Sequence, residues 1–374
     1  MTFCWPQLIA SLAFAPALLA ACGGGGGGSG GHRFPAAATS LVAADMAVLI
    51  AAGDATSEAI GRAYQLARGI PEANMVRVPV AVRTDSMPAT DFATFKAAID
   101  ARLPARVQAT LVTWTRPSRV TGTTIAGAAC SMGITSALAL GYDTRYCGGC
   151  VATAATTYYG SSSHRPFTDH GVRPSMMLGA ATLAEAQALI DRGRAADGTW
   201  ANGSRNGGNA GQAWLMRTSD AARSVRAGDF RMLAASTVTG LTMHYVDNAS
   251  GSGSDVVANQ ARVMFYFTGL VTVPQIATNS YLPGAVADHL TSSGGALPDG
   301  GGQMPVTAWL AAGLTGSYGT VEEPCNFTEK FPRASVLVDR YQGGDTLIEA
   351  YWKSVRWPGQ GLFVGEPLAR PWVR

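Results

Sequence analysis

Short apolar runs alternate with segments of helical periodicity in the first part of the chain after residue 45. Three runs are continuous and apolar, as strands buried on both faces are: 47–51, 75–80 and 109–115. Between them, apolar residues recur every three or four positions, and Asp54 and Thr90 stand where N-caps belong. Gly69 and Pro71 end the first of these helical segments. This alternation predicts right-handed βαβ units and a parallel sheet.

The same alternation returns in the second half of the chain. Thr182 with Glu185, and Thr346 with Glu349, have the spacing of capping boxes, and Gly193 marks the expected end of the first of these helices. The expected strands are 213–218, 241–246, 263–267, 317–321 and 362–364, and a further helix is expected over 305–312. We therefore predict one α/β domain over residues 45–374, with a mostly parallel sheet flanked by helices.

The segment from about 121 to 173 interrupts this pattern. It is rich in Gly, Ser, Thr and Tyr, and it contains Cys130, Cys147 and Cys150. Together with Cys325, these cysteines predict two disulfides, with three connectivities open, in an irregular insertion. The Cys147-Gly-Gly-Cys150 spacing leaves two alternatives, a redox-active pair or a four-cysteine zinc site.

The N-terminus has the features of an export signal. Residues 1–21 carry no charged side chain, and their apolar run ends in Leu19-Ala20-Ala21-Cys22. This ending resembles the lipobox of bacterial lipoproteins, in which the signal is cleaved before a cysteine that is then lipidated. The Gly- and Ser-rich stretch that follows is typical of a flexible tether. We predict a signal at 1–21, a tether at 22–44 and a lipid anchor on Cys22; the alternatives are a cleaved signal with a free cysteine, or a short buried apolar tail.

Composition narrows the functional classes. Charged residues make up 14% of the chain, against about 25% in an average soluble domain, and the net charge is +3. The apolar content excludes a disordered chain, and the lack of a basic run argues against a nucleic-acid partner. Because nucleotide fingerprints are absent from the sequence, we expect no cofactor. His164, Asp169 and His170 could form a metal cluster with Asp143 or Asp247, but their spacing is not a specific ligand pattern, so no metal is expected.

Several blocks of sequence are similar to an uncharacterised family of exported bacterial proteins. The resemblance spans nearly all of the chain after the tether and implies export to the bacterial cell envelope, at the outer membrane or the periplasmic face, without implying an activity. The blocks are 68–71, 134–137, 173–178, 283–292, 318–326 and 357–368.

A more distant resemblance is to the gingipain-type cysteine peptidases of the caspase-like fold. It is carried by 316–324, 346–350 and Gly365-Glu366-Pro367. It implies a strand that ends in His-Gly, followed by a strand that ends in the nucleophilic cysteine. In this chain the first strand end reads Thr268-Gly269, and the second falls at 290–293, where Ser292 lies. The dyad is therefore degenerate or displaced.

His289 and Cys325 are a histidine and a cysteine in the expected order. Glu322 and Glu323 next to Cys325 disfavour a thiolate, because nearby negative charge raises the pKa of a thiol. This favours a disulfide for Cys325, and a structural role is the alternative for His289, which we expect in a helix-like segment. The sequence leaves two functions open: a hydrolase of the cysteine-peptidase type, with His289, Cys325, Thr268 and Ser292 as candidates, or a non-enzymatic binding or assembly lipoprotein with a protein or peptide ligand.

Overall fold

The computed structural model describes residues 1, 40–124, 126–201, 204–205 and 210–373. The predicted signal and most of the tether, with Cys22, fall in 2–39, outside the described residues. Residues Ala38–Arg374 form one compact unit, to which the following description applies. Among the described residues, no helix has the length and apolar content needed to cross a membrane.

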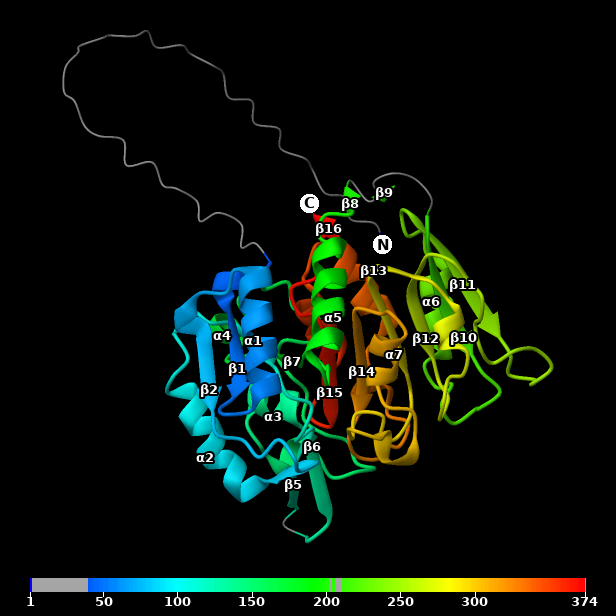
Figure 1. Ribbon diagram of the computed structural model, residues 1–374. Helices are drawn as coiled ribbons and strands as arrows, with labels where there is room; N and C mark the ends of the chain where they lie inside the picture. Colours follow the sequence, from blue (N-terminus) through cyan, green and yellow to red (C-terminus); the bar gives the residue numbers. More distant parts are fainter. Residues whose placement is uncertain (2–39, 125, 202–203, 206–209, 374) are drawn as a thin grey trace, which may run out of the picture. The chain divides into compact units, whose positions relative to one another are not determined.

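Within the described residues, ten strands form one central sheet in the order β11-β10-β12-β13-β14-β15-β7-β4-β1-β2 (Figure 1). The strands are β1 (Met46–Ala51), β2 (Met75–Val78), β4 (Ala109–Val112), β7 (Ser175–Met177), β10 (Gly211–Arg217), β11 (Leu241–Asp247), β12 (Val263–Thr268), β13 (Tyr281–His289), β14 (Gly316–Thr320) and β15 (Gly361–Gly365). Two small sheets join β3 (Ser86–Pro88), β5 (Arg119–Thr123) and β6 (Ala129–Gly133), and β8 (Trp200–Ala201), β9 (Ser204–Arg205) and β16 (Trp372–Val373).

The central sheet is largely parallel, as the alternation of the sequence predicts. The pairs β1–β2, β1–β4, β4–β7, β10–β11, β10–β12, β12–β13 and β13–β14 are all parallel. Strand β15 runs antiparallel to β14, and Val364 pairs with Met177 of β7. The fold is therefore the predicted α/β class, with β15 joining the strands of the two halves of the chain.

Helices cover both faces of the sheet. In Figure 1, α1, α5 and α7 lie on the face turned toward the reader. Two glycines of β14 define the faces: a Cβ on Gly319 would meet Val306, just before α7, and a Cβ on Gly316 would meet Leu347 of α9. The helices are α1 (Ala55–Arg68), α2 (Ala89–Asp100), α3 (Ile134–Leu140), α4 (Pro166–His170), α5 (Leu183–Ala196), α6 (Ala227–Ala235), α7 (Thr307–Ala311), α8 (Ala334–Gln342) and α9 (Leu347–Ser354).

The helix ends follow the sequence signals only in part. Asp54 caps α1, and Thr346 with Glu349 forms the predicted capping box of α9. The prediction for Thr90 is wrong, because α2 begins at Ala89 and its N-cap is Pro88. The prediction that Gly193 ends α5 is also wrong.

A packing contact explains the error at Gly193. A Cβ on this residue would lie 2.4 Å from Oε2 of Glu366, which comes from the segment after β15. The glycine is therefore needed inside the helix because another segment approaches closely, and α5 continues to Ala196.

Two segments with weak sequence signals differ from the predictions. The segment around His289 is not helical: it is the end of β13, a strand of nine residues that lies between β12 and β14. The insertion is not irregular throughout, because it contains the buried helix α3. Polar residues can form this buried helix since Ser136 Oγ donates to the carbonyls of Pro358 and Gly361 beside β15.

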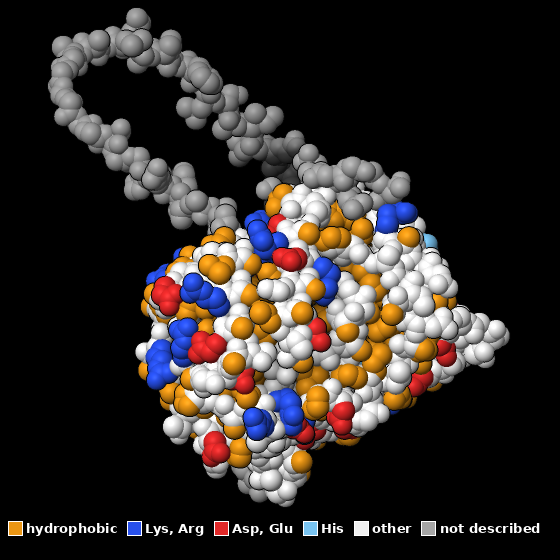
Figure 2. Space-filling model, in the orientation of Figure 1, with side chains coloured by type: hydrophobic (Ala, Val, Ile, Leu, Met, Phe, Trp, Pro, Cys, Tyr) orange, Lys and Arg blue, Asp and Glu red, His pale blue; other side chains and the backbone are white. Residues whose placement is uncertain are grey.

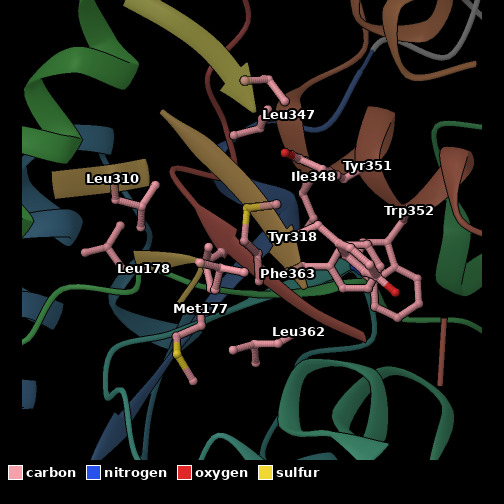
Figure 3. Close-up of a cluster of buried hydrophobic side chains, with 14 of the residues drawn as sticks. Met177, Leu178, Leu310, Tyr318, Leu347, Ile348, Tyr351, Trp352, Leu362 and Phe363 are labelled. Atoms are coloured by element: carbon pink, nitrogen blue, oxygen red, sulfur yellow. The ribbon is translucent and has the colours of Figure 1, made fainter. Parts of the chain in front are cut away.

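A cluster of buried aromatic and aliphatic side chains lies where α9 packs on β14 and β15 (Figure 3). The rings of Trp352 and Phe363 stack with centroids 4.5 Å apart, and Tyr318 meets the edge of Phe363 at 4.9 Å. Trp352 Nε1 also donates to the carbonyl of Ser175, which ties α9 to β7. Burying three large aromatic side chains at this point is worth several kcal/mol by their apolar area.

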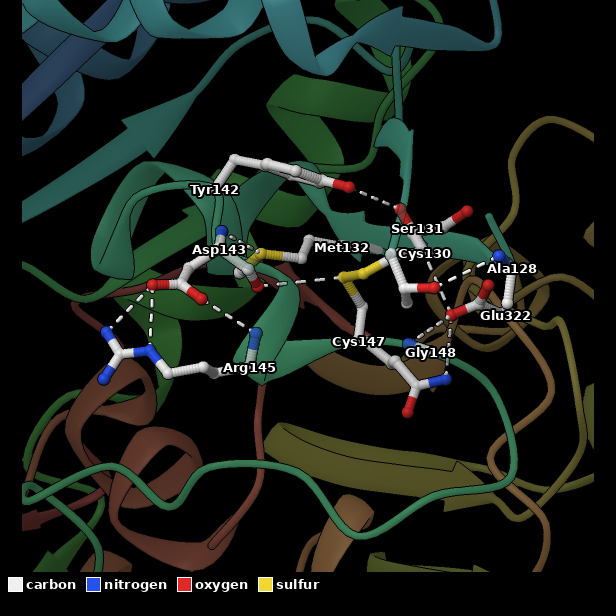
Figure 4. The surroundings of a disulfide bond; sticks show 12 residues. Ala128, Cys130, Ser131, Met132, Tyr142, Asp143, Arg145, Cys147, Gly148 and Glu322 are labelled. Atoms are coloured by element: carbon white, nitrogen blue, oxygen red, sulfur yellow. Dashed lines mark hydrogen bonds and ion pairs between the residues drawn. A yellow bond between two sulfur atoms is a disulfide. The ribbon is translucent and has the colours of Figure 1, made fainter. Parts of the chain in front are cut away.

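The four cysteines form the predicted two disulfides, with the connectivity Cys130–Cys147 and Cys150–Cys325. The first lies within the insertion (Figure 4), and the second joins the insertion to the segment after β14. Oε2 of Glu322, just after β14, accepts backbone N–H groups from Ser131, Gly148 and Gly149 at 3.1–3.3 Å. The insertion is therefore held to the end of β14 by one covalent bond and one carboxylate.

Replacing Cys150 and Cys325 together by serine should destabilise the protein more than replacing Cys130 and Cys147. The two disulfides span 175 and 17 residues, and loop-closure entropy predicts losses of about 5 and about 3 kcal/mol respectively. Guanidinium unfolding of the two double variants and the wild type measures the difference. Equal losses, or free thiols at these four positions in the unreduced wild type, would contradict this account.

Candidate functional site

The ends of β12, β13 and β14 lie next to one another, which is where the resemblance to cysteine peptidases places a catalytic dyad. Thr268, the last residue of β12, pairs in register with His289, the last residue of β13. The chain after β13 then forms a loop over residues 290–306 that leads into α7. In open α/β sheets ligands bind beyond such strand ends, so this loop and its surroundings form the candidate site.

An ion pair buried in the sheet holds the two strand ends together. Asp288 is fully buried, and Nη2 of Arg226 lies 2.6 Å from its Oδ1. Burial raises the pKa of the Asp288 carboxyl, against the opposing effect of the Arg226 charge. The same guanidinium donates to the carbonyl of Thr268 at 2.8 Å. Arg226 therefore links β12 and β13 through a backbone carbonyl and a carboxylate.

His289 is enclosed and both of its ring nitrogens are engaged. Trp309 Nε1 donates to Nδ1 at 3.0 Å, and Nε2 lies 3.1 Å from the carbonyl of Met304. Since Nδ1 accepts, Nε2 carries the proton and donates it to that carbonyl. Burial, against the opposing effect of the hydrogen bond to Met304, lowers the pKa of His289 to about 4, with smaller contributions from the charges of Arg226 and Arg223. His289 is thus a neutral histidine whose hydrogen bonds tie β13 to the loop and to α7.

The structure does not form the predicted pair of His289 and Cys325. The sulfur of Cys325 is bonded to Cys150, so it is no nucleophile while the disulfide is intact. The sequence argument from Glu322 and Glu323 pointed to the disulfide, and the structure shows that bond. In this structure His289 and Cys325 are therefore each bonded to other groups and do not form the expected dyad.

The hydroxyl groups at the strand ends form hydrogen bonds mainly within the loop after β13. Thr291 Oγ1 donates to Gln303 Oε1 at 2.6 Å, and Ser293 Oγ donates to the carbonyl of Gly300 at 2.6 Å. Ser292 is half-buried, and its carbonyl accepts from Thr320 Oγ1. Thr268 is fully buried. In the part of the chain that the structure describes, no histidine is hydrogen-bonded to any of these hydroxyl groups, so none of the candidate hydroxyl groups at the strand ends has a base beside it.

The grouping of His164, His170 and neighbouring aspartates is also not formed. His164 contacts Glu349 and Asp345, whereas His170 Nε2 is hydrogen-bonded to Ser161 Oγ. Asp143 pairs with Arg145, and Asp247 pairs with Arg217. His244, on β11, stacks on Trp214 with ring centroids 4.1 Å apart, and burial lowers its pKa. Spacing along the chain gave no signal for Asp345 and Glu349, because they lie about 180 residues from His164.

A groove of about 390 Å³ opens between α5, α7 and the loop after β13. Figure 2 shows hydrophobic side chains at the surface over these helices. The groove is lined by loops that follow three different strands, together with the two helices: Thr115, Gly179, Ala180, Ala181, Glu185, Ala188, Leu189, Arg192, Leu297, Pro298, Pro305, Thr307, Ala308, Leu310 and Ala311. Its volume is in the range of small-ligand sites.

Three hydrogen bonds hold the walls of the groove in place. Leu297 N donates to Ser118 Oγ at 3.0 Å, which joins the loop after β13 to the segment after β4. Arg192 Nη2 donates to the carbonyls of Leu310 and Leu314, which joins α5 to α7. Burial lowers the pKa of Arg192. The walls are thus built from segments far apart in the sequence, which is why no local motif indicates the groove.

Comparison with known proteins adds little to this picture. No family model matches the chain, and no curated protein does. Among solved structures, a chain described as "Structure of Protease" matches with a TM-score of 0.38 and 9% sequence identity, over 88% of this chain and 79% of that one. A similarity this low does not assign an activity.

Replacing His289 by glutamine should flatten the dependence of stability on pH. The unfolded chain binds a proton on histidine near pH 6.5 and the folded chain only near pH 4. Folding is therefore opposed as the pH falls between these values, by on the order of 3 kcal/mol for this group at pH 4. Glutamine can keep one of the two hydrogen bonds and does not titrate. Urea unfolding in steps between pH 4 and 7 should show this part of the loss in the wild type and not in His289→Gln.

The neighbouring substitution Thr268→Val serves as the control. It alters the adjacent strand end without removing a titratable group, so it should keep the wild-type slope. If His289→Gln has the same slope as the wild type, His289 is not held neutral in the folded protein.

Proposed function

We propose that the chain is an exported lipoprotein, anchored through Cys22, whose α/β body binds an extended peptide in the groove between α5 and α7. The lipobox-like ending and the Gly-rich tether support the anchor. The body resembles gingipain-type peptidases in placing the two dyad positions at the ends of neighbouring parallel strands, β12 and β13. In this proposal the residues at the strand ends have a structural role, and the adjoining groove binds the peptide.

One observation favours binding over cysteine-peptidase chemistry. The two residues that could supply a dyad are both committed: Cys325 to a disulfide, and His289 to Trp309 and Met304. A Cys–His nucleophile needs a free thiolate beside an accessible base. We therefore propose a body that shares the strand arrangement of such peptidases and uses it without that reaction.

The lining of the groove favours a peptide. Ala181, Ala188 and Ala311 supply exposed apolar surface, and Pro298 and Pro305 stiffen the loop that forms one wall. The hydroxyl groups of Thr115 and Thr307 and the carboxylate of Glu185 also line the groove. Apolar walls with a few polar groups fit side chains together with backbone N–H and C=O groups.

Cys22→Ser should release the protein from membranes. Serine cannot carry the thioether-linked lipid, and stable attachment to a bilayer requires the acyl chains. Fractionation of cells that express the wild type and the variant, followed by immunoblotting, measures the partition. Cys4→Ser is the matched control, since Cys4 lies inside the proposed signal, and it should stay with the membranes. A Cys22→Ser protein that fractionates with membranes as the wild type does would refute the anchor.

Ala188→Trp and Ala311→Trp should each weaken peptide binding at least about 10-fold. Both alanines are exposed on helices in the groove lining, so an indole fills the groove without entering the core. The probe is a synthetic library of seven-residue peptides, with affinities of selected members measured by fluorescence anisotropy. Gln187→Trp adds the same side chain at an exposed α5 position outside the lining and should bind as the wild type does. Equal binding by all four proteins would place the peptide site elsewhere.

A further inference from the structure

A histidine and two carboxylates converge where the insertion packs against the start of α9. His164 Nδ1 lies 2.7 Å from Glu349 Oε1 and 3.4 Å from Asp345 Oδ1. One ligand atom from each of the three residues lies within 4.8 Å of the other two. The Asp345 side chain is 6% exposed and that of Glu349 is fully buried, whereas the His164 side chain is 22% exposed. The group is therefore enclosed by protein and reachable from solvent on the side of His164.

The second oxygen of each carboxylate is held by other groups of the protein. Asp345 Oδ2 lies 2.8 Å from Nζ of Lys353, which is itself fully buried. Glu349 Oε2 accepts from Thr346 N, Thr346 Oγ1 and Leu41 N at 2.6–3.2 Å. Apart from their contacts with one another, His164 Nδ1, Asp345 Oδ1 and Glu349 Oε1 are thus the atoms left to share a ligand. Carboxylates that bind metals are oriented by such outer hydrogen bonds.

The net charge of the group favours the binding of a cation. Two carboxylates face one ammonium, so the group carries one net negative charge if His164 is neutral, in surroundings where an uncompensated charge is costly. The spacing also fits a metal. Bonds of about 2.0–2.2 Å in a tetrahedral site place neighbouring ligand atoms about 3.3–3.6 Å apart, a range that includes the 3.4 Å between His164 Nδ1 and Asp345 Oδ1. The 2.7 Å contact between His164 Nδ1 and Glu349 Oε1 would open by about 0.6–0.9 Å to reach this spacing.

We propose that His164, Asp345 and Glu349 bind a divalent transition-metal cation of the Zn²⁺ class, with a fourth position open to water on the exposed side of His164. One imidazole nitrogen and two carboxylate oxygens suit this class of metal. The cation would tie the insertion to α9 in addition to the hydrogen bond from Gly160 N to the carbonyl of Lys353. A proton on His164 would supply the same missing charge, so the experiment must separate a metal from a proton.

The test is a titration of the untagged, full-length mature protein in detergent, with its disulfides intact, after treatment with EDTA. Isothermal calorimetry with ZnCl₂ at pH 7.5 should show one equivalent bound by the wild type. His164→Ala should lower the affinity at least about 100-fold. His170→Ala is the matched control: His170 belongs to the same stretch of the insertion but is hydrogen-bonded to Ser161, and its variant should bind as the wild type does.

Asp345→Asn provides a second variant that keeps the side-chain volume and should also bind at least about 10-fold more weakly. Circular dichroism establishes that each variant is folded, and the thermal midpoint should rise with Zn²⁺ in the wild type and in His170→Ala only. If the folded wild type binds no Zn²⁺, the proposal fails. If His164→Ala binds as tightly as the wild type, the metal lies elsewhere and the proposal also fails. Neither result bears on the anchor or the groove.

Discussion

The ion pair between Arg68 and Glu366 is the contact on which the two halves of this chain depend. Glu366, just after β15, is fully buried; it accepts from Arg68 Nε and Nη2 at 2.9 and 2.6 Å and from the Tyr64 hydroxyl at 2.8 Å. Both donors lie on α1, about 300 residues earlier, and Gly193 of α5 leaves the space that the carboxylate fills. A bidentate guanidinium–carboxylate pair fixes direction as well as distance. It therefore sets how α1 and α5 lie against the strand that joins the two halves of the sheet.

Buried polar contacts also occupy the polar groups at the ends of β12 and β13. Arg226 binds Asp288 and the carbonyl of Thr268, and His289 connects β13 to Met304 and Trp309. In a peptidase, the end of a strand must leave a base and a nucleophile unbonded and within reach of a substrate. Here the polar groups at the ends of β12 and β13 are used to hold neighbouring strands and the loop after β13. That loop also forms one wall of the groove. The contacts that hold the strand ends therefore also hold the proposed binding surface in place.

The sequence predicted those parts of the fold that depend on local pattern. Strands buried on both faces and helices with caps, such as α1 and α9, carry their signal within about fifteen residues, and they were found. The apolar pattern alone does not predict a strand over 281–289, because Pro283 and Gly284 interrupt its apolar run; only the resemblance to cysteine peptidases places a strand end here, at 290–293, and β12 and β14 lie on either side of the strand. The prediction that Gly193 ends α5 is wrong for a related reason, because the need for glycine at this position comes from Glu366, which is far away in the sequence.

The sequence predicts where the candidate site lies in the fold, but not which of its residues contact one another. The strand ends followed from the order of elements, whereas the pairing of Cys325 with Cys150 and the meeting of His164 with Asp345 and Glu349 depend on how the insertion folds back, which spacing does not encode.

The low charge of the chain becomes informative once the buried pairs are considered together. Only 14% of residues are charged, yet Arg68–Glu366, Arg226–Asp288 and Lys353–Asp345 all lie largely or wholly inside the protein. The first two pairs join different elements, and Lys353–Asp345 ties α9 to the residues just before it. Buried pairs contribute little net stability compared with apolar residues of similar size, but losing one partner costs about 3–5 kcal/mol. Alternative packings that separate these partners are therefore penalised far more than slippage of apolar side chains would be. We infer that in this largely apolar body the few internal charges select one arrangement of helices and strands, while the apolar core supplies most of the stabilising free energy.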